Sequence, residues 1–93
     1  MRNQYIIAYD ISDNKRLNRL HNCLLGYGDS IQYSIFVCGL SLKEKEIMVA
    51  DIYSIIRPSE DSVIIYNAGR DIDRKLETIG IKKKIHERKA III

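Results

Sequence analysis

Asp10 is the residue whose position most clearly indicates chemistry. It ends an apolar run that begins at Tyr5, and it precedes a basic segment containing Lys15, Arg16 and Arg19. An acid at the end of a buried strand is held by a rigid element, while the start of the next helix and its arginines attract anions. A single carboxylate beside such groups indicates a divalent metal ion, a phosphodiester, or both.

The position of Asp10 also has an ordinary structural interpretation. An Asp that follows a strand often only shapes the turn or caps the next helix. As a metal ligand it would be incomplete alone, because Mg²⁺ usually takes one or two carboxylates together with water and phosphate. Two Asp10 side chains related by a two-fold axis would form a better site, where a bound ion could activate water or clamp a phosphodiester.

The side chains around this acid have either packing or binding roles. Tyr9 should face the opposite side of the sheet, which favours packing. Arg16 and Arg19 lie three positions apart on one helix face, where they either hold a phosphate backbone or remain solvated. Phe36 is expected in the core, and His21 is expected to be a partly buried packing residue.

The composition describes one small, mildly basic domain. The chain has 93 residues, 46% of them hydrophobic and 29% charged, with a net charge of +3. That charge permits nucleic-acid binding without requiring it. No stretch approaches the roughly 20 apolar residues of a membrane span, and the N-terminus lacks a signal-peptide pattern, so we expect a cytoplasmic protein. Phosphate-loop, dinucleotide-loop, paired-cysteine and zinc-protease motifs are absent from the sequence.

The elements that position these residues alternate between strand and helix. In chain order, we expect a strand over residues 5–10, a helix capped by Ser12 or Asp13, a bent strand or short hairpin over 30–39, a helix started by the capping box Ser41 to Glu44, and a strand over 61–67. Residues 70–78 could form a short strand, a helical turn or a loop. The short connections predict an α+β sandwich, with a ferredoxin-like arrangement as the leading candidate. A single domain should span residues 1–93, with its core over about 1–67 and a C-terminal arm over about 68–93.

The C-terminal arm has a distinctive composition. A basic run, Lys82–Lys84, precedes an ending in Ile91–Ile93. The lysines either face nucleic acid or protect a strand edge. As a strand, the isoleucines would place apolar side chains on both faces and present an unpaired edge. Pairing with the sheet of a second subunit resolves this, and it predicts a homodimer that could supply a second Asp10.

Taken together, these residues resemble the family of CRISPR-associated protein two, the small adaptation protein of CRISPR immunity. The pattern covers nearly the whole chain in order. It consists of Tyr9-Asp10-Ile11-Ser12-Asp13 with Arg16 and Arg19, then Gly28-Asp29, Ile31-Gln32-Tyr33-Ser34-Ile35-Phe36, and Asp61-Ser62-Val63-Ile64-Ile65-Tyr66.

The resemblance implies a ferredoxin-like βαββαβ homodimer whose extra C-terminal strand adds to the sheet of the other subunit. It implies that Asp10 is catalytic and that Asp10 from both subunits binds a shared metal, Mg²⁺ or Mn²⁺. It also implies endoribonuclease activity, with duplex DNA as a further substrate, and a partnership with the CRISPR integrase (CRISPR-associated protein one) in acquiring new spacers. By resemblance, Tyr9, Arg16, Arg19 and Phe36 match positions linked to activity or nucleic-acid binding.

Two positions depart from the family pattern. Ser30 stands where members often have Arg, and Val37 stands where they often have Glu. These departures remove a phosphate contact and a second acid near the strand, which weakens the case for vigorous nuclease activity. Two alternatives therefore accompany the nuclease. One is a non-catalytic DNA-binding scaffold that bridges integrase dimers, and the other is a toxin-like ribonuclease similar to virulence-associated protein D.

Overall fold

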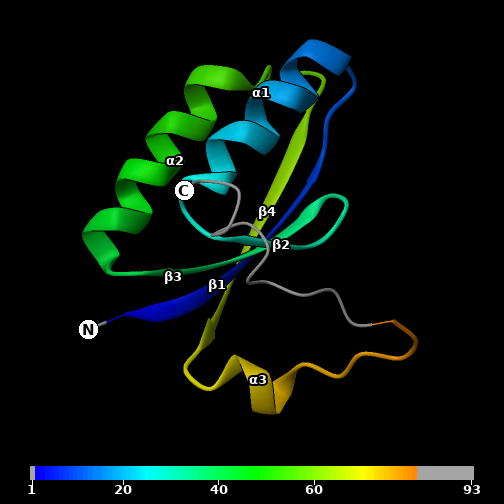
Figure 1. Cartoon of the computed structure of the whole chain (residues 1–93). Coiled ribbons are helices and arrows are strands. Elements are labelled where there is room, and N and C mark those ends of the chain that lie inside the picture. Colours follow the sequence, from blue (N-terminus) through cyan, green and yellow to red (C-terminus); the bar gives the residue numbers. More distant parts are fainter. Residues whose placement is uncertain (1, 82–93) are drawn as a thin grey trace, which may run out of the picture.

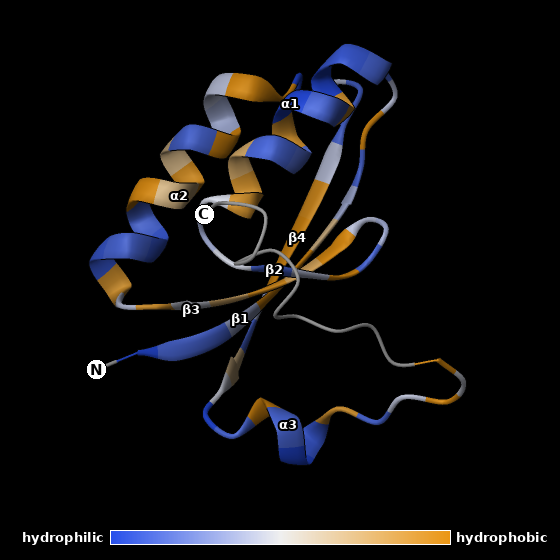
Figure 2. Cartoon of the chain, viewed as in Figure 1, coloured by the Kyte–Doolittle hydropathy of each residue, from blue (hydrophilic) through white to orange (hydrophobic). Residues whose placement is uncertain are grey.

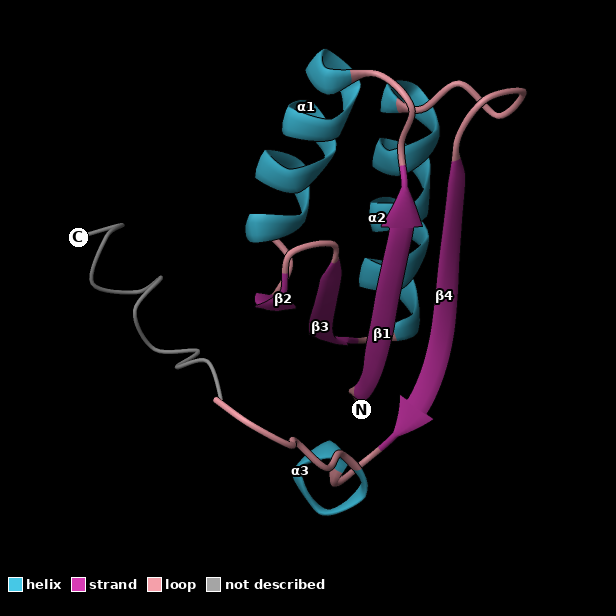
Figure 3. Ribbon diagram, turned by 90° about the vertical axis from the view of Figure 1, so that its right-hand side faces the viewer, coloured by secondary structure: helices cyan, strands magenta, loops and turns pink. Residues whose placement is uncertain are grey.

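The computed structural model describes residues 2–81, which form an antiparallel sheet covered on one face by two helices (Figures 1 and 3). The elements are β1 (Asn3–Asp10), α1 (Asn14–Leu25), β2 (Asp29–Gln32), β3 (Ile35–Leu40), α2 (Leu42–Ile55), β4 (Ser62–Gly69) and the short α3 (Ile72–Lys75). The strand order is β2-β3-β1-β4, and β1 pairs antiparallel with both β3 and β4. This confirms the predicted ferredoxin-like arrangement.

Both main helices begin at the predicted capping residues. Of the two candidates before α1, Asp13 forms the cap, because its carboxylate accepts a hydrogen bond from the Arg16 backbone N–H at 2.9 Å. Before α2, the Ser41 hydroxyl accepts from the Glu44 N–H at 3.1 Å and the Glu44 carboxylate accepts from the Ser41 N–H at 2.8 Å. The predicted capping box is thus confirmed.

The segment over residues 30–39 is a hairpin rather than one bent strand. Strands β2 and β3 are joined at Tyr33 and Ser34, with a register irregularity between Ser30 and Gln32. The Tyr9 N–H donates to the Ser34 carbonyl at 3.2 Å, which ties the hairpin to the end of β1. A side chain at Gly28 would meet the Val37 carbonyl at 2.3 Å, so the approach to this hairpin requires glycine.

The core lies between the inner sheet face and the two helices. It comprises Tyr5, Ile7, Tyr9, Leu20, Leu24, Phe36, Cys38, Leu40, Met48 and Ile52. Figure 2 shows apolar residues along β3 and the middle of β4, with apolar and polar turns alternating in both helices. Phe36 is fully buried, as predicted.

The opposite sheet face is apolar but uncovered by α1 and α2. Ile6 lies between Val37 and Tyr66 in cross-strand register, and Ala8 lies between Ile35 and Ile64. The Ile64 and Tyr66 side chains are 64% and 63% exposed. These six residues define the outer face, an apolar surface that the paired strands present on the side away from the helices.

Beyond β4, part of the C-terminal arm is described. Residues 70–78, for which strand, turn and loop were open, include the helical turn α3. The predicted C-terminal strand, the Lys82–Lys84 run and Ile91–Ile93 lie outside the described residues. Within residues 2–81, no helix is long and apolar enough to cross a bilayer.

Candidate functional site

Asp10 projects from the end of a rigid strand. It is the last residue of β1 and pairs with Ser62 at the start of β4. The residue is exposed. Within residues 2–81, its carboxylate has neither an ion pair nor a side-chain hydrogen bond. The backbone of Asp10 is therefore fixed while its carboxylate remains available to a ligand.

Tyr9 points to the other side of the sheet, as its alternation predicts. The residue is 6% exposed, and its ring stacks on Phe36 with centroids 6.2 Å apart. The hydroxyl lies 3.1 Å from His21 Nδ1 and 3.4 Å from the Tyr33 carbonyl oxygen. Burial, more than the neighbouring Tyr33, raises the pKa of Tyr9. Tyr9 thus packs and anchors the strand that carries Asp10.

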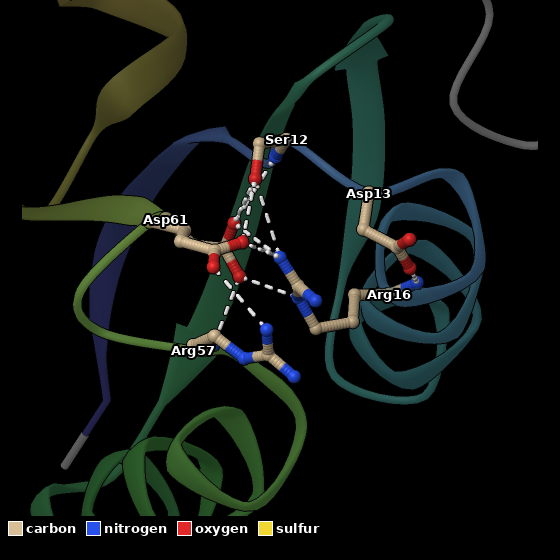
Figure 4. Close-up of polar contacts among 6 residues, drawn as sticks. Ser12, Asp13, Arg16, Arg57 and Asp61 are labelled. Carbon is tan, nitrogen blue, oxygen red and sulfur yellow. Dashed lines mark hydrogen bonds and ion pairs between the residues drawn. The ribbon is translucent and has the colours of Figure 1, made fainter.

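A buried carboxylate, Asp61, lies immediately before β4 and has no exposed side-chain surface. Its Oδ1 accepts hydrogen bonds from the Ser12 backbone N–H at 3.0 Å and the Ser12 hydroxyl at 3.2 Å. Its Oδ2 accepts from the Arg57 backbone N–H and from Arg16 Nε, both at 2.8 Å. Figure 4 shows the Asp61 carboxylate pointing at these donors.

Arg16 is the main electrostatic partner of Asp61. Its side chain is only 14% exposed, and Nη2 donates to Asp61 Oδ1 at 3.1 Å and to Glu60 Oε1 at 3.2 Å. The hydrogen bond from Arg16 is the largest cause that holds the pKa of Asp61 well below its usual range, and the donors on Arg57 and Ser12 add to it against the effect of burial. The same bond raises the pKa of Arg16.

The two predicted phosphate-binding arginines therefore have different surroundings. Arg16 has an internal partner, Asp61, that the sequence analysis did not identify. Arg19 is exposed, and its side chain has no partner within the described part of the chain. Phe36, which was expected from the resemblance to influence activity, is wholly inside the core. Its influence on activity would have to act through packing rather than through contact with a substrate.

A metal ion would fit better between two copies of this chain than on one. In the described residues, no three His, Cys, Asp or Glu side chains come together as a metal site. Asp10 offers one free carboxylate per protomer, and Asp61 already has both oxygens occupied. Since Mg²⁺ accepts one or two protein carboxylates completed by water and phosphate, a pair of Asp10 side chains fits it better than one.

Comparison with known families identifies the family of this chain. The family model described as "CRISPR associated protein Cas2" matches residues 3–76. The chain belongs to the Cas2 family. This match includes Asp10 and Asp61, and it confirms the resemblance found in the sequence.

Cas2 relatives match most of the chain. It is 34% identical over 91 residues to "CRISPR-associated endoribonuclease Cas2 1" of Rhodospirillum rubrum, covering 96% of this chain and 89% of the relative. It is 46% identical over 66 residues to "CRISPR-associated endoribonuclease Cas2 2" of Thermodesulfovibrio yellowstonii, covering 71% of this chain and 72% of the relative.

Two solved structures share the fold. One is a hypothetical protein, TT1823, from Thermus thermophilus, with a TM-score of 0.81 and 27% identity, covering 90% of this chain and 98% of that protein. The other is Streptococcus pyogenes Cas2 at pH 6.5, with a TM-score of 0.77 and 27% identity, covering 83% and 99%. Both likenesses support the fold described above.

Proposed function

We propose that this Cas2 protein is a metal-dependent endoribonuclease of CRISPR adaptation, with Asp10 as its catalytic residue. The observation that carries the proposal is the exposed carboxylate of Asp10, which lacks a partner within residues 2–81 although its backbone is fixed in β1. A carboxylate held in this way can bind a cation without first breaking an internal contact. The names of the curated relatives support the reaction class.

Two copies of Asp10, one from each protomer of a homodimer, would hold Mg²⁺ or Mn²⁺. Such an ion, when bound, would make a coordinated water more acidic and offset charge on a phosphodiester. Arg19 would contact the phosphate backbone, because its guanidinium is exposed on the helix that follows Asp10. RNA is the primary substrate in this proposal, and duplex DNA is the second.

A cleavage assay with Asp10→Asn tests the catalytic role. RNA and duplex DNA are incubated with wild-type protein and the variant across Mg²⁺ and Mn²⁺ concentrations, with a chelator as the blank. We expect the rate to fall by about 100-fold or more, on the scale of losing a principal charge-stabilising group. Sedimentation should show an unchanged oligomeric state. Wild-type cleavage by Asp10→Asn would contradict the proposal.

The outer face supports the homodimer that the site requires. The two main helices do not cover its two rows of apolar side chains, and Ile64 and Tyr66 are therefore largely exposed. Burying such a patch against a second copy would remove apolar area from water. Strand exchange by the C-terminal segment remains a separate prediction for the same dimer.

Two tyrosines provide a matched test of this interface. Tyr66 lies on the outer face and is 63% exposed, while Tyr53 lies on α2 and is 65% exposed. We expect Tyr66→Asp to raise the dimer dissociation constant at least about tenfold, because it would bury an unpaired charge. Tyr53→Asp should leave it unchanged. Equal sedimentation profiles for the two variants at micromolar concentration would exclude this face.

A second candidate function is a DNA-binding scaffold that bridges dimers of the CRISPR integrase without cutting. It is favoured by the presence of only one free acid, Asp10, at this site in the described protomer, and by the internal partner of Arg16. The scaffold predicts normal spacer acquisition with Asp10→Asn, whereas a required nuclease predicts its loss. An acquisition assay with integrase present therefore separates the two.

A further inference from the structure

We infer that Asp61 is a positioning residue for Asp10: its buried carboxylate holds the turn between β1 and α1 in the conformation that presents the Asp10 side chain. This inference rests on the proposed role of Asp10. Asp61 does not touch the reacting atoms in this scheme. It acts through Ser12 and through the first turn of α1.

The chain on both sides of Asp10 is held by residues outside its own strand. On one side, the Tyr9 backbone N–H donates to the Ser34 carbonyl at 3.2 Å, and the Tyr9 hydroxyl contacts His21 and the Tyr33 carbonyl. On the other side, both the backbone N–H and the hydroxyl of Ser12 end on Asp61 Oδ1. Because the Asp10 carboxylate has no described contact of its own, its direction depends on this backbone.

Three segments converge on the two oxygens of Asp61. The turn after β1 contributes Ser12, the first turn of α1 contributes the Arg16 guanidinium, and the loop before β4 contributes the Arg57 N–H. Asp61 also directly precedes Ser62, the residue that pairs with Asp10 across β1 and β4. The carboxylate therefore links the turn that follows Asp10 to the strand that lies beside it.

The network needs a carboxylate and cannot be satisfied by an amide. Both Oδ1 and Oδ2 of Asp61 accept from N–H donors, and Oδ1 also accepts from the Ser12 hydroxyl. An Asn at this position has one accepting oxygen, so its NH₂ group would face donors in either orientation. In one orientation the Ser12 N–H and Arg16 Nη2 contacts are lost, and in the other the Arg57 N–H and Arg16 Nε contacts are lost. Asp61→Asn should therefore weaken the hydrogen bonds that join the turn after β1 to the loop before β4, while a side chain of nearly the same size still fills the position.

Glu60 provides a matched control one residue away. It also pairs with Arg16 Nη2, at 3.2 Å, but it is exposed and its other ion-pair partner is the exposed Arg57 side chain. Glu60→Gln removes the same charge from the same loop. It leaves the backbone hydrogen bond from Ser12 to Asp61 in place.

The experiment compares wild type, Asp61→Asn and Glu60→Gln at a temperature where circular dichroism shows all three folded. We expect Asp61→Asn to speed amide hydrogen exchange at least about tenfold, relative to Ile7 in the middle of β1, at whichever backbone N–H loses its acceptor, that of Ser12 or that of Arg57. Mn²⁺ affinity should fall about 10- to 100-fold, the usual cost of losing a group that orients a ligand. The cleavage kcat should fall by a similar factor, with KM within about twofold. Glu60→Gln should leave all these quantities within about twofold.

Two variants of Ser12 test the inference if Asp61→Asn does not fold. Ser12→Ala deletes the hydroxyl, which contacts Asp61, Arg16 Nη2 and Glu60, and keeps the backbone bond to Asp61, so kcat should fall about threefold. Ser12→Thr, which retains the hydroxyl, should restore it. A folded Asp61→Asn protein with wild-type exchange at both Ser12 and Arg57, or with wild-type kcat, would overturn the inference, and so would identical rates for the two Ser12 variants.

These outcomes are distinct from failure of the proposed function. If Asp10→Asn cleaves like wild type, or wild type neither cleaves nor binds Mn²⁺, the proposed function is wrong. The exchange rates at Ser12 and Arg57 then still decide whether Asp61 holds the turn. If Asp10→Asn is inactive and Asp61→Asn has normal kcat and exchange, only the positioning role of Asp61 is wrong.

Discussion

Asp10 and Asp61 lie at the same end of the same strand pair, yet their surroundings are opposite. Asp10 pairs through its backbone with Ser62, the residue that follows Asp61. The Asp10 residue is exposed, whereas the Asp61 side chain is completely buried and both its oxygens accept hydrogen bonds. A buried carboxylate must accept hydrogen bonds from donors inside the protein, while an exposed one can bind a cation. The same side chain thus serves the fold at one position and is available for chemistry at the other.

The remaining predicted site residues divide in the same way. Phe36 is buried and Arg16 is engaged with Asp61, so both resemble Asp61 in their surroundings. Arg19 is exposed and resembles Asp10. Loss of activity on mutation can therefore arise from loss of folding or from loss of a contact with substrate. Stability measurements made beside activity assays separate these causes.

The strongest test on the buried side is Phe36→Ala. Removing this fully buried ring should lower the free energy of unfolding by about 3–5 kcal/mol, because the lost apolar contacts leave a cavity. Urea unfolding followed by circular dichroism measures the change. Tyr33→Ala is the control, since that side chain is 72% exposed and should cost no more than about 0.5 kcal/mol. A cost below about 1 kcal/mol for Phe36→Ala would contradict the separation of buried residues that stabilise the fold from exposed residues that are available to a ligand.

Acid unfolding tests the buried carboxylate. The pKa of Asp61 is lowered from its ordinary value of 3.8, chiefly by the Arg16 hydrogen bond, so the unfolded chain binds this proton more readily. The stability that Asp61 contributes is present above about pH 4 and is lost as pH falls below 3.8 through the lower folded pKa. We expect Asp61→Asn to be less stable than wild type at pH 7 and to lose less further stability between pH 5 and pH 2.

The same titration on Glu60→Gln sharpens the comparison. The pKa of Glu60 is also lowered, first by its hydrogen bond with Arg57, but this carboxylate is exposed. Solvent screening should make its contribution smaller. Thermal unfolding midpoints at each pH give the result. Parallel curves for wild type and Asp61→Asn would mean that the buried acid is not the source of the acid sensitivity.

Much of the fold could be predicted because its signals are local. The capping box at Ser41 and Glu44 and the strand over residues 5–10 each depend on residues close in sequence, and the structure confirms both. The hairpin over residues 30–39 stayed open because Tyr33-Ser34 carries no glycine turn signature. The turn α3 spans only four residues, too few for a hydrophobic period to be recognised.

The site was less predictable because its contacts are distant in sequence. Asp10 was identified by its place between a strand and a basic helix. Asp61 lay within the family pattern but without a role, because its donors on Ser12 and Arg16 are 49 and 45 positions away. For the same reason, Arg16 and Arg19 looked equivalent on one helix face. Only the tertiary structure distinguishes the arginine held by Asp61 from the one left exposed.

The smallest expected effect on stability belongs to Arg19→Ala, and it tests the exposed side of the comparison. The free energy of unfolding should change by no more than about 0.5 kcal/mol, because no described residue pairs with this side chain. RNA binding should weaken, and the slope of log affinity against log salt should flatten by about 0.7 for a single strand, corresponding to one lost phosphate contact. Arg16→Ala is the counterpart, which should lower stability because it removes the main partner of Asp61. Fluorescence anisotropy across a salt series gives the slopes. An unchanged slope for Arg19→Ala would show that exposure near Asp10 is not enough to make an arginine a phosphate ligand.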